Sequence, residues 1–308
     1  MRARLIAAFA AVYILWGSTY LAISFAVKTL PPLLMAGARF ATAGVILLLW
    51  ARFSERGNKP SRRDWTTGLI SGSLLLLGGN GLVVWAEQRV PSGIAALLAA
   101  VVPLWMVLLD WARPGGRRPA GVMFVGLALG LAGLAMLIGP DALRGEGGAV
   151  SLSGAVALVL ASLSWAAGSL YTKHAPRATS SLLGAATQMI AGGLCLWVVA
   201  IIAGEPGQMD LAHASRSSIL GLLYLITFGS IIGFTSYVYL LAHTTAAKAA
   251  TYAYVNPVVA VLLGWALAHE TVTPRTLVAA AIILSAVAII TLARDHESPE
   301  PEEARVAA

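Results

Sequence analysis

The sequence predicts an all-α polytopic membrane protein, with ten transmembrane helices arranged as two inverted five-helix repeats. Three observations predict this fold class. The composition lacks the charge that a soluble surface needs, long apolar runs recur along the chain, and the second half repeats motifs of the first half. Together they indicate a protein whose main solvent is lipid.

Composition excludes an ordinary soluble domain. Of 308 residues, 58% are hydrophobic and 11% are charged, and the mean hydropathy is +0.79. A soluble domain carries about 25% charged residues. The net charge of +7 does not indicate nucleic-acid binding, because the basic residues lie between apolar runs and not on a shared patch. With Cys195 as the single cysteine, a disulfide framework and a cysteine-based metal site are excluded.

Ten apolar runs are each long enough to cross a bilayer, for which a helix needs about 20 residues. Turn-forming stretches such as LPP, RPGGRRP and GEPGQ separate them. The first run is longer than the apolar core of a signal peptide, about 7–15 residues, so we interpret it as a true span. The predicted spans are 5–27, 33–51, 67–86, 92–111, 120–139, 151–171, 181–203, 217–241, 247–267 and 275–293.

The distribution of Lys and Arg predicts the orientation, because short cytoplasmic loops are enriched in these residues. With the N-terminus inside, 15 of the 21 fall on the cytoplasmic side, 5 fall outside, and Arg39 lies within a span. We therefore expect both termini in the cytoplasm, with the chain in a bacterial-type inner membrane. The acidic stretch 295–308 is predicted to be a disordered tail.

Two pairs of motifs reveal an internal repeat. PSGIAALLAAVVPLWMVLLDW at 91–111 aligns with TAAKAATYAYVNPVVAVLLGW at 245–265, and GSTY at 17–20 aligns with GSLY at 168–171. The shift is about half the chain in both cases. The sequence therefore predicts two units of similar structure.

The predicted units are 1–140 and 151–294, with five spans each. Because five is an odd number, the two units must enter the membrane in opposite senses. Inverted repeats with interrupted helices at matching positions are typical of secondary transporters, whose substrate site lies near the bilayer midplane where the repeats meet.

Several motifs give the chain a likeness to a known family. They are WGSTY near the start, GARF at 37–40, SGIAALLAAVVPLW at 92–105 and YVNPVVAVLLGWALAHETVTPRTL at 254–277. In their order and spacing the sequence resembles the ten-span drug/metabolite transporter superfamily in its EamA branch, which includes the YddG group of aromatic amino-acid exporters. The resemblance implies two inverted repeats around one central cavity, and outward transport of small metabolites, often amino acids. Gly116 aligns with Glu270, so a symmetric acidic pair is not expected.

The first predicted span carries hydrogen-bonding groups that lipid penalises, and these are the first candidate substrate-binding residues. Trp16 and Tyr20 are four residues apart and share a helix face. Ser18 and Thr19 can bond to their own backbone and bend the helix. We interpret this stretch as a cavity lining; helix packing or an interfacial aromatic belt is the alternative.

Polar and aromatic side chains in other spans extend the candidate site. Asn80 lies in GGNG, which interrupts the third span, and an amide in lipid needs a partner or water. Asn256 directly precedes Pro257, which frees a backbone carbonyl and favours a hinge that the amide helps to satisfy. Helix packing is the alternative for both. The further candidates are Trp85, Trp165, Ser169, Tyr224 and Tyr252.

Two charged residues are assigned a charge role. Arg39 lies six residues into the second span, about 9 Å deep at 1.5 Å per residue. We expect it to reach back to the interface or to pair with Glu87 near the outer end of the third span; the alternative is an anchor for a substrate carboxylate. Proton coupling needs a deeply buried carboxyl group, and the sequence does not place Glu87, Asp110 or Glu270 clearly at depth.

These observations favour a secondary transporter that moves small amphipathic metabolites by alternating access. Amino acids with aromatic or large neutral side chains fit an aromatic cavity with few fixed charges. Another metabolite or drug as substrate, or a passive channel, is the alternative. No P-loop and no carboxylate cluster or HExxH of a membrane enzyme is present, so we predict no cofactor, metal or catalytic residue. The expected partners are a small-molecule substrate and the lipid bilayer, without nucleic acid; the oligomeric state stays open, a monomer included.

Overall fold

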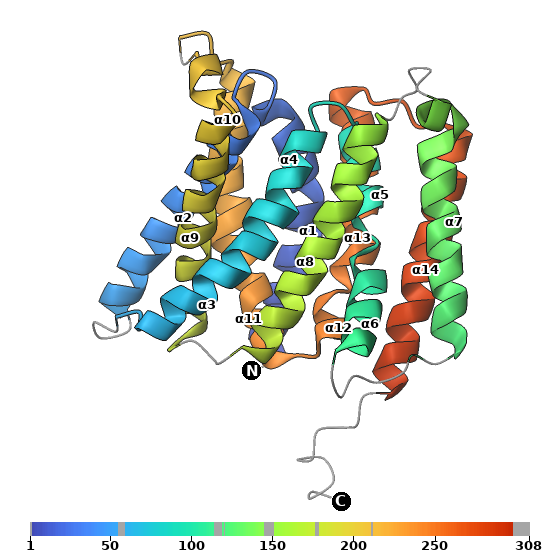
Figure 1. Cartoon of the computed structure of the whole chain (residues 1–308), viewed down its shortest axis with the longest axis horizontal. Helices are drawn as coiled ribbons and strands as arrows, with labels where there is room; N and C mark the ends of the chain where they lie inside the picture. The colour runs from blue at the N-terminus through green and yellow to red at the C-terminus, as the bar shows by residue number, and fades with distance from the viewer. Residues whose placement is uncertain are drawn as a thin grey trace, which may run out of the picture.

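The computed structural model describes residues 2–54, 59–113, 119, 121–144, 151–175, 179–210 and 212–297. All regular structure in these residues is helical, and ten helical rods cross the molecule side by side (Figure 1). Eight rods are long and apolar enough to span a membrane, and the shorter helices Tyr252–Ala268 and Pro274–Ile290 are also apolar. The predicted ten-helix membrane fold is confirmed.

The rods follow the chain in order. They are α1 (Arg2–Ala26), α2 (Pro32–Ser54), α3–η1–α4 (Arg62–Gly72, Ser73–Gly81, Leu82–Ala86), α5–α6 (Ser92–Ala99, Val102–Ala112), α7 (Gly121–Arg144), α8 (Leu152–His174), α9 (Ser181–Ile202), α10–η3–α11 (Arg216–Tyr224, Leu225–Phe234, Thr235–His243), α12–α13 (Ala246–Ala249, Tyr252–Ala268) and α14 (Pro274–Glu297). A short 3₁₀ turn, η2 (Glu205–Gln208), follows α9. The end of the bundle at which α1 begins and α14 ends is at the bottom of Figure 1 and is called the lower end; the other is the upper end.

The third rod begins at Arg62, one turn before the predicted span. Ser61 caps it, because its hydroxyl accepts from Asp64 N at 3.1 Å while the Asp64 carboxylate accepts from Ser61 N at 2.7 Å. This reciprocal pair satisfies two backbone donors at the helix start. Polar capping therefore extends the helix beyond the apolar run that predicted it.

Two rods contain a π-helical segment at matching places in the two repeats, η1 in the third rod and η3 in the eighth. The predicted interruption at GGNG is thus a widening of a continuous helix and not a break. Side chains bind carbonyl groups of both segments: Ser164 Oγ donates to Leu74 O at 2.8 Å, and Trp16 Nε1 donates to Gly229 O at 3.1 Å. Each π segment is therefore tied to a helix of the other repeat.

The fourth and ninth rods are broken, the fourth between α5 and α6 and the ninth between α12 and α13. Pro103 stands at the start of α6, where its missing N–H removes no helical hydrogen bond. Pro257, in contrast, lies inside α13, which continues through it. Pro257, at which the sequence predicts a hinge, therefore does not interrupt α13, and the break of this rod lies before Tyr252.

The two repeats pack against each other through equivalent rods. α2 packs on α9 at the left of Figure 1, and α7 packs on α14 at the right. Small residues let the first pair approach closely, because a Cβ added at Gly193 would lie only 2.7 Å from Ala41 N and 3.1 Å from Gly37 O. The other six rods lie between these two pairs and surround the centre of the molecule.

At the upper end, carboxylates of the second repeat bind helix N-termini of the first. Glu205 accepts hydrogen bonds from Leu33 N at 3.1 Å and from Leu34 N at 2.8 Å, at the start of α2. Glu270 accepts from Ser92 N at 2.8 Å, at the start of α5. A negative charge at a helix N-terminus is favourable, so both contacts hold the repeats together at this end.

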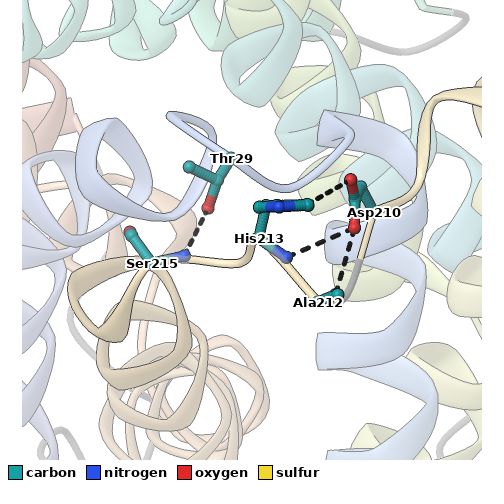
Figure 2. Close-up of polar contacts among 5 residues, drawn as sticks. All are labelled: Thr29, Asp210, Ala212, His213 and Ser215. Carbon is teal, nitrogen blue, oxygen red and sulfur yellow. Dashed lines mark hydrogen bonds and ion pairs between the residues drawn. The ribbon is translucent and has the colours of Figure 1, made fainter.

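The loop before α10 also joins the two repeats (Figure 2). Asp210 accepts from Ala212 N at 3.1 Å and His213 N at 3.2 Å, and its carboxylate lies 2.7 Å from His213 Nδ1. Thr29, in the loop after α1, accepts from Ser215 N at 3.0 Å through its hydroxyl. The loop is thus folded on itself and attached to the first repeat.

Candidate functional site

A cavity lies at mid-depth in the bundle, between rods of both repeats. Its empty volume, including the part that opens to solvent, is about 660 Å³. Ligand sites are mostly apolar, with a few placed polar groups. Eight residues that the sequence singles out line it: Trp16, Thr19, Tyr20, Arg39, Asn80, Trp165, Tyr252 and Asn256.

Five other residues that the sequence singles out lie outside this lining: Ser18, Trp85, Ser169, Tyr224 and Glu87. Ser18 faces away from the cavity, and its hydroxyl lies 2.6 Å from that of Tyr224. The indole of Trp85 is covered by the guanidinium of Arg89, 4.5 Å from the ring centre. The prediction from helix faces therefore assigned these residues to the same site as the eight lining residues, whereas the structure places them outside the cavity lining.

Four aromatic rings form the lower wall of the cavity. Trp16 and Trp165 each come from the GSxY region of one repeat, and Tyr237 and Tyr252 come from later rods. The Trp16 ring centre lies 5.3 Å from that of Trp165, 4.9 Å from that of Tyr237 and 5.3 Å from that of Tyr252. Trp165 and Tyr237 are 5.6 Å apart. Edge-on and tilted ring pairs at these distances are favourable, so the cluster is a packed wall built by both repeats.

A second cavity lies below this wall, at the lower end of the bundle. Its empty space is about 1,230 Å³, including the part that opens to solvent. Its lining is mixed and includes the charged side chains of Asp64 and Lys173 and the polar side chains of Gln188 and His243. Within the described residues, no three His, Cys, Asp or Glu side chains lie close enough to hold a metal ion.

One hydrogen bond lies between the two cavities. Ser169 follows Trp165, of the central cavity, and precedes Thr172, of the lower cavity, along α8. Its hydroxyl lies 2.6 Å from the hydroxyl of Tyr237, and both residues are fully buried. Together with the aromatic wall, this bond lies between the central and lower cavities.

Arg39 brings a positive charge into the cavity wall. The residue is 3% exposed, so it does not reach the interface, contrary to one expectation. Its Nε donates to Ser230 Oγ in η3 at 2.8 Å, and its guanidinium carbon lies 4.5 Å from the ring centre of Phe40. The predicted pairing with Glu87 is not formed within 4.0 Å, and Nη1 is buried without a hydrogen-bond partner.

The two asparagines of the lining differ in their contacts. In the amide orientation that satisfies its surroundings, Asn256 donates to Tyr13 O at 3.0 Å and to Tyr252 O at 3.3 Å, so it ties α13 to α1. The Oδ1 atom of Asn80 is buried and accepts no hydrogen bond. The described lining therefore holds one unsatisfied acceptor, on Asn80, and two donors without a hydrogen-bond partner, Arg39 Nη1 and Trp165 Nε1.

The sequence reasoning missed Tyr237, Phe234 and Phe40, which pack at or line the cavity. It chose Tyr224 for the eighth rod, on the assumption of a regular α-helix. The π segment η3 places more residues in each turn and so rotates the face that follows it, which carries Tyr237 to the aromatic wall. Tyr224, which precedes η3, stacks on Phe228 with 4.9 Å between ring centres and lies outside the cavity lining.

Comparison with known proteins decides the family. A sequence profile of the EamA-like transporter family matches residues 3–139 and again 152–292. The chain belongs to the EamA-like transporter family. A relative in Escherichia coli K12, the "Uncharacterized inner membrane transporter YedA", is 42% identical over 286 residues, which cover 92% of this chain and 89% of the relative.

More distant relatives of this EamA protein occur in plants and other bacteria. The "WAT1-related protein At3g02690, chloroplastic" of Arabidopsis thaliana is 25% identical over 281 residues, 90% of this chain and 67% of the relative. The "Uncharacterized transporter YvbV" of Bacillus subtilis is 25% identical over 279 residues, 90% and 88% of the two chains. One crystal structure matches over 94% of this chain and 98% of the other, with a TM-score of 0.66 at 20% identity. At this identity the match shows a shared fold alone. The family and the apolar helices identify a multi-pass membrane transporter.

Proposed function

We propose that this transporter exports small amphipathic metabolites by alternating access, and that its substrates are amino acids with aromatic or large neutral side chains. The observation that carries the proposal is the cavity itself. It combines an aromatic wall, built by both repeats, with one buried guanidinium that has an unpaired donor. A substrate for such a cavity needs an apolar body and an anionic group.

The carboxylate of an amino acid suits the unsatisfied Nη1 donor of Arg39. Hydrogen bonds between a guanidinium and a carboxylate are charge-assisted and strong in a buried site. The unsatisfied Oδ1 atom of Asn80 is an acceptor for the ammonium group of the same substrate. A zwitterion would thus provide partners for Arg39 Nη1 and Asn80 Oδ1 at once, and its carboxylate could also accept from the unpaired Nε1 of Trp165.

The aromatic wall suits the side chain of the substrate. Trp16, Trp165 and Tyr252 are part of the lining, and an aromatic ring added to such a cluster gains about 0.5–1.5 kcal/mol beyond the area it buries. A large aliphatic or thioether side chain gains by burial of its apolar surface. Small hydrophilic amino acids lack both contributions, so we expect them to be poorer substrates.

In the proposed alternating-access cycle, Ser169 and Tyr237 separate, the central cavity opens to the lower cavity, and the upper end closes. We propose that the lower end faces the cytoplasm, since most Lys and Arg of the chain belong to segments at that end. Substrate would then enter through the lower cavity and leave at the upper end. A passive channel would need both passages open together, and counterflow of labelled against unlabelled substrate separates the two mechanisms.

Efflux from preloaded cells tests the proposal. Cells that contain labelled tryptophan, phenylalanine or methionine should release them faster with the wild type than without the protein. Trp16→Ala, at matched expression, should slow release about tenfold, since the ring packs against three others and its loss removes at least 1.4 kcal/mol of contacts. Trp111→Ala is the matched control, because Trp111 is 42% exposed on the outside of the bundle.

The outcomes separate the parts of the proposal. If no amino acid leaves faster with the wild type, amino acids are not the substrates. If Trp16→Ala exports as fast as the wild type and Trp111→Ala, the central cavity is not the substrate site.

A further inference from the structure

Glu87 is a buried acid without a partner at the upper end of the cavity wall. It caps α4 one turn above Val83, which lines the cavity, and its N–H donates to Val83 O at 2.9 Å. The residue is 6% exposed, and both carboxyl oxygens are buried and accept no hydrogen bond. Glu205 and Glu270, also at the upper end, are each held by backbone N–H groups. Glu87 thus differs from the acids that have a structural role.

The charges around Glu87 come from different elements. Arg39 on α2 attracts a negative charge at Glu87, whereas Glu270, after α13, repels it. The hydroxyl of Tyr20, on α1, also interacts with this carboxyl group. On its own loop, Arg89 is engaged with the ring of Trp85.

Other elements packed against α4 add no charge near Glu87. η1 carries no titratable residue, and the titratable residues of α8 lie in its last turn at the lower end. Arg52, the other charged residue in the described part of α2, lies in its last turn, also at the lower end. Arg39 is therefore the cation available to an ionised Glu87.

An ionised carboxylate that is buried without hydrogen bonds costs several kcal/mol, whereas its neutral form costs much less. In this conformation Arg39 is directed at Ser230 and lies more than 4.0 Å from Glu87. The arrangement therefore fits a neutral, protonated Glu87. The guanidinium remains available for a different carboxylate, that of the substrate.

We propose that Glu87 is the proton-binding group of the transport site, and that a substrate carboxylate bound at Arg39 is accompanied by one proton on Glu87. The proposal rests on the role of Arg39 as carboxylate anchor under the proposed function. Without substrate, Glu87 is neutral at low pH, the state that this structure fits, and as the pH rises it releases its proton to water and turns to Arg39 as the counter-ion. With substrate, the substrate carboxylate binds Arg39, and an ionised Glu87 takes one proton from water and becomes a neutral acid.

Proton binding at Glu87 and substrate binding at Arg39 are linked, and each favours the other. An ionised Glu87 competes with the substrate for Arg39, so substrate affinity is highest at low pH and falls as pH rises through the titration of Glu87. For one linked proton the fall is about tenfold per pH unit. Substrate binding to the wild type must also take up close to one proton per substrate where Glu87 is ionised beforehand.

The test is binding of labelled phenylalanine to the purified protein across a pH series. The wild type should lose affinity about tenfold per pH unit above the titration of Glu87, and Glu87→Gln, a neutral isostere of the protonated acid, should bind with one affinity throughout. Asp210→Asn is the matched control, because this acid is in an exposed loop of the upper end (Figure 2), and it should keep the wild-type profile. A Glu87→Gln profile that follows the wild type overturns the proposal.

Two further measurements test the protonation of Glu87 in other ways. The first uses the wild type alone, and the second does not need phenylalanine to bind. A pH-indicator dye in weakly buffered solution should report proton uptake when phenylalanine binds to the wild type, and no uptake overturns the proposal. If phenylalanine does not bind, which is a failure of the proposed function, infrared spectroscopy still tests Glu87. At a pH below the titration of Glu87, the carbonyl band of a neutral carboxylic acid should be stronger in the wild type than in Glu87→Gln, and a band of equal intensity in both overturns the proposal.

Discussion

Removal of the Tyr237 hydroxyl should open the passage between the central and lower cavities. Tyr237→Phe deletes one oxygen atom and keeps the ring, so the packing against Trp16 at 4.9 Å is retained. Ser169 keeps a partner, because its hydroxyl also donates to Trp165 O at 2.7 Å. The variant therefore removes one bond across the passage without leaving the Ser169 hydroxyl unpaired.

The structure sets the size of the effect. A hydrogen bond between neutral buried groups contributes about 0.5–1.5 kcal/mol when its loss leaves no unpaired group. Because the bond joins α8 to α11 across the passage, all of this contribution acts on the equilibrium between the closed and open passage. The open fraction should increase about 2- to 10-fold. Ser169→Ala added to Tyr237→Phe should increase it little further, since the two changes remove the same bond.

Cysteine labelling measures the open fraction. In a Cys195→Ser background, which removes the free cysteine, Ala161→Cys places one thiol in the lining of the central cavity. A membrane-impermeant thiol reagent applied from the lower side reaches it only through the passage. The labelling rate should increase by the same factor as the open fraction.

A second hydroxyl pair provides the control. Tyr224 and Ser18 are also joined at 2.6 Å, outside the lining of the cavity, so Tyr224→Phe removes an equivalent bond that does not lie between the two cavities. It should leave the labelling rate unchanged. Equal labelling rates in Tyr237→Phe and Tyr224→Phe would refute the assignment of the Ser169–Tyr237 bond as the closure.

Two further predictions concern the contacts between the repeats. Gly193→Ala should lower the free energy of unfolding by about 1–3 kcal/mol, as overpacking does, because its Cβ meets Ala41 N at 2.7 Å; Gly207→Ala, with nothing within 4 Å, should be neutral in the same denaturation assay. Glu270→Gln should cost about 1 kcal/mol, since it removes the negative charge at the N-terminus of α5, where the carboxylate accepts from Ser92 N and Ser92 Oγ. Thermal unfolding in detergent measures it, and an unchanged midpoint would contradict a stabilising role.

Apolar length and repeated motifs were sufficient to predict the number of rods, because a bilayer leaves few alternatives to a spanning helix. They were not sufficient for the shape of each rod. Pro257 predicted a hinge, whereas the break of this rod lies earlier, before Tyr252; α13 continues through Pro257, where Asn256 ties it to α1. The Ser61 cap that lengthens the third rod is polar, so a search for apolar runs did not find it.

The site was predictable where a rod is a regular helix and unpredictable beyond a π segment. Trp16 and Tyr20 on α1 are at the cavity, as four-residue spacing on one helix predicts. Tyr237 was missed because it follows η3, whose wider turns shift the face that a 3.6-residue period assigns. Arg39 was expected at the interface or on Glu87, and its actual partner, Ser230, is 191 residues away in the sequence. No local pattern reports such a contact.

The widened helices at equivalent places in the two repeats have a consequence for the history of the site. A single five-helix ancestor that already carried the π segment accounts for both copies, and two such units in opposite orientations would enclose a binding site with two equal walls. A polar ligand could lie in that ancestral site in either of two directions. In the present chain α2 contributes Arg39, whereas α9, its counterpart, carries no charged residue. One guanidinium on one wall gives an asymmetric ligand a single direction in the site.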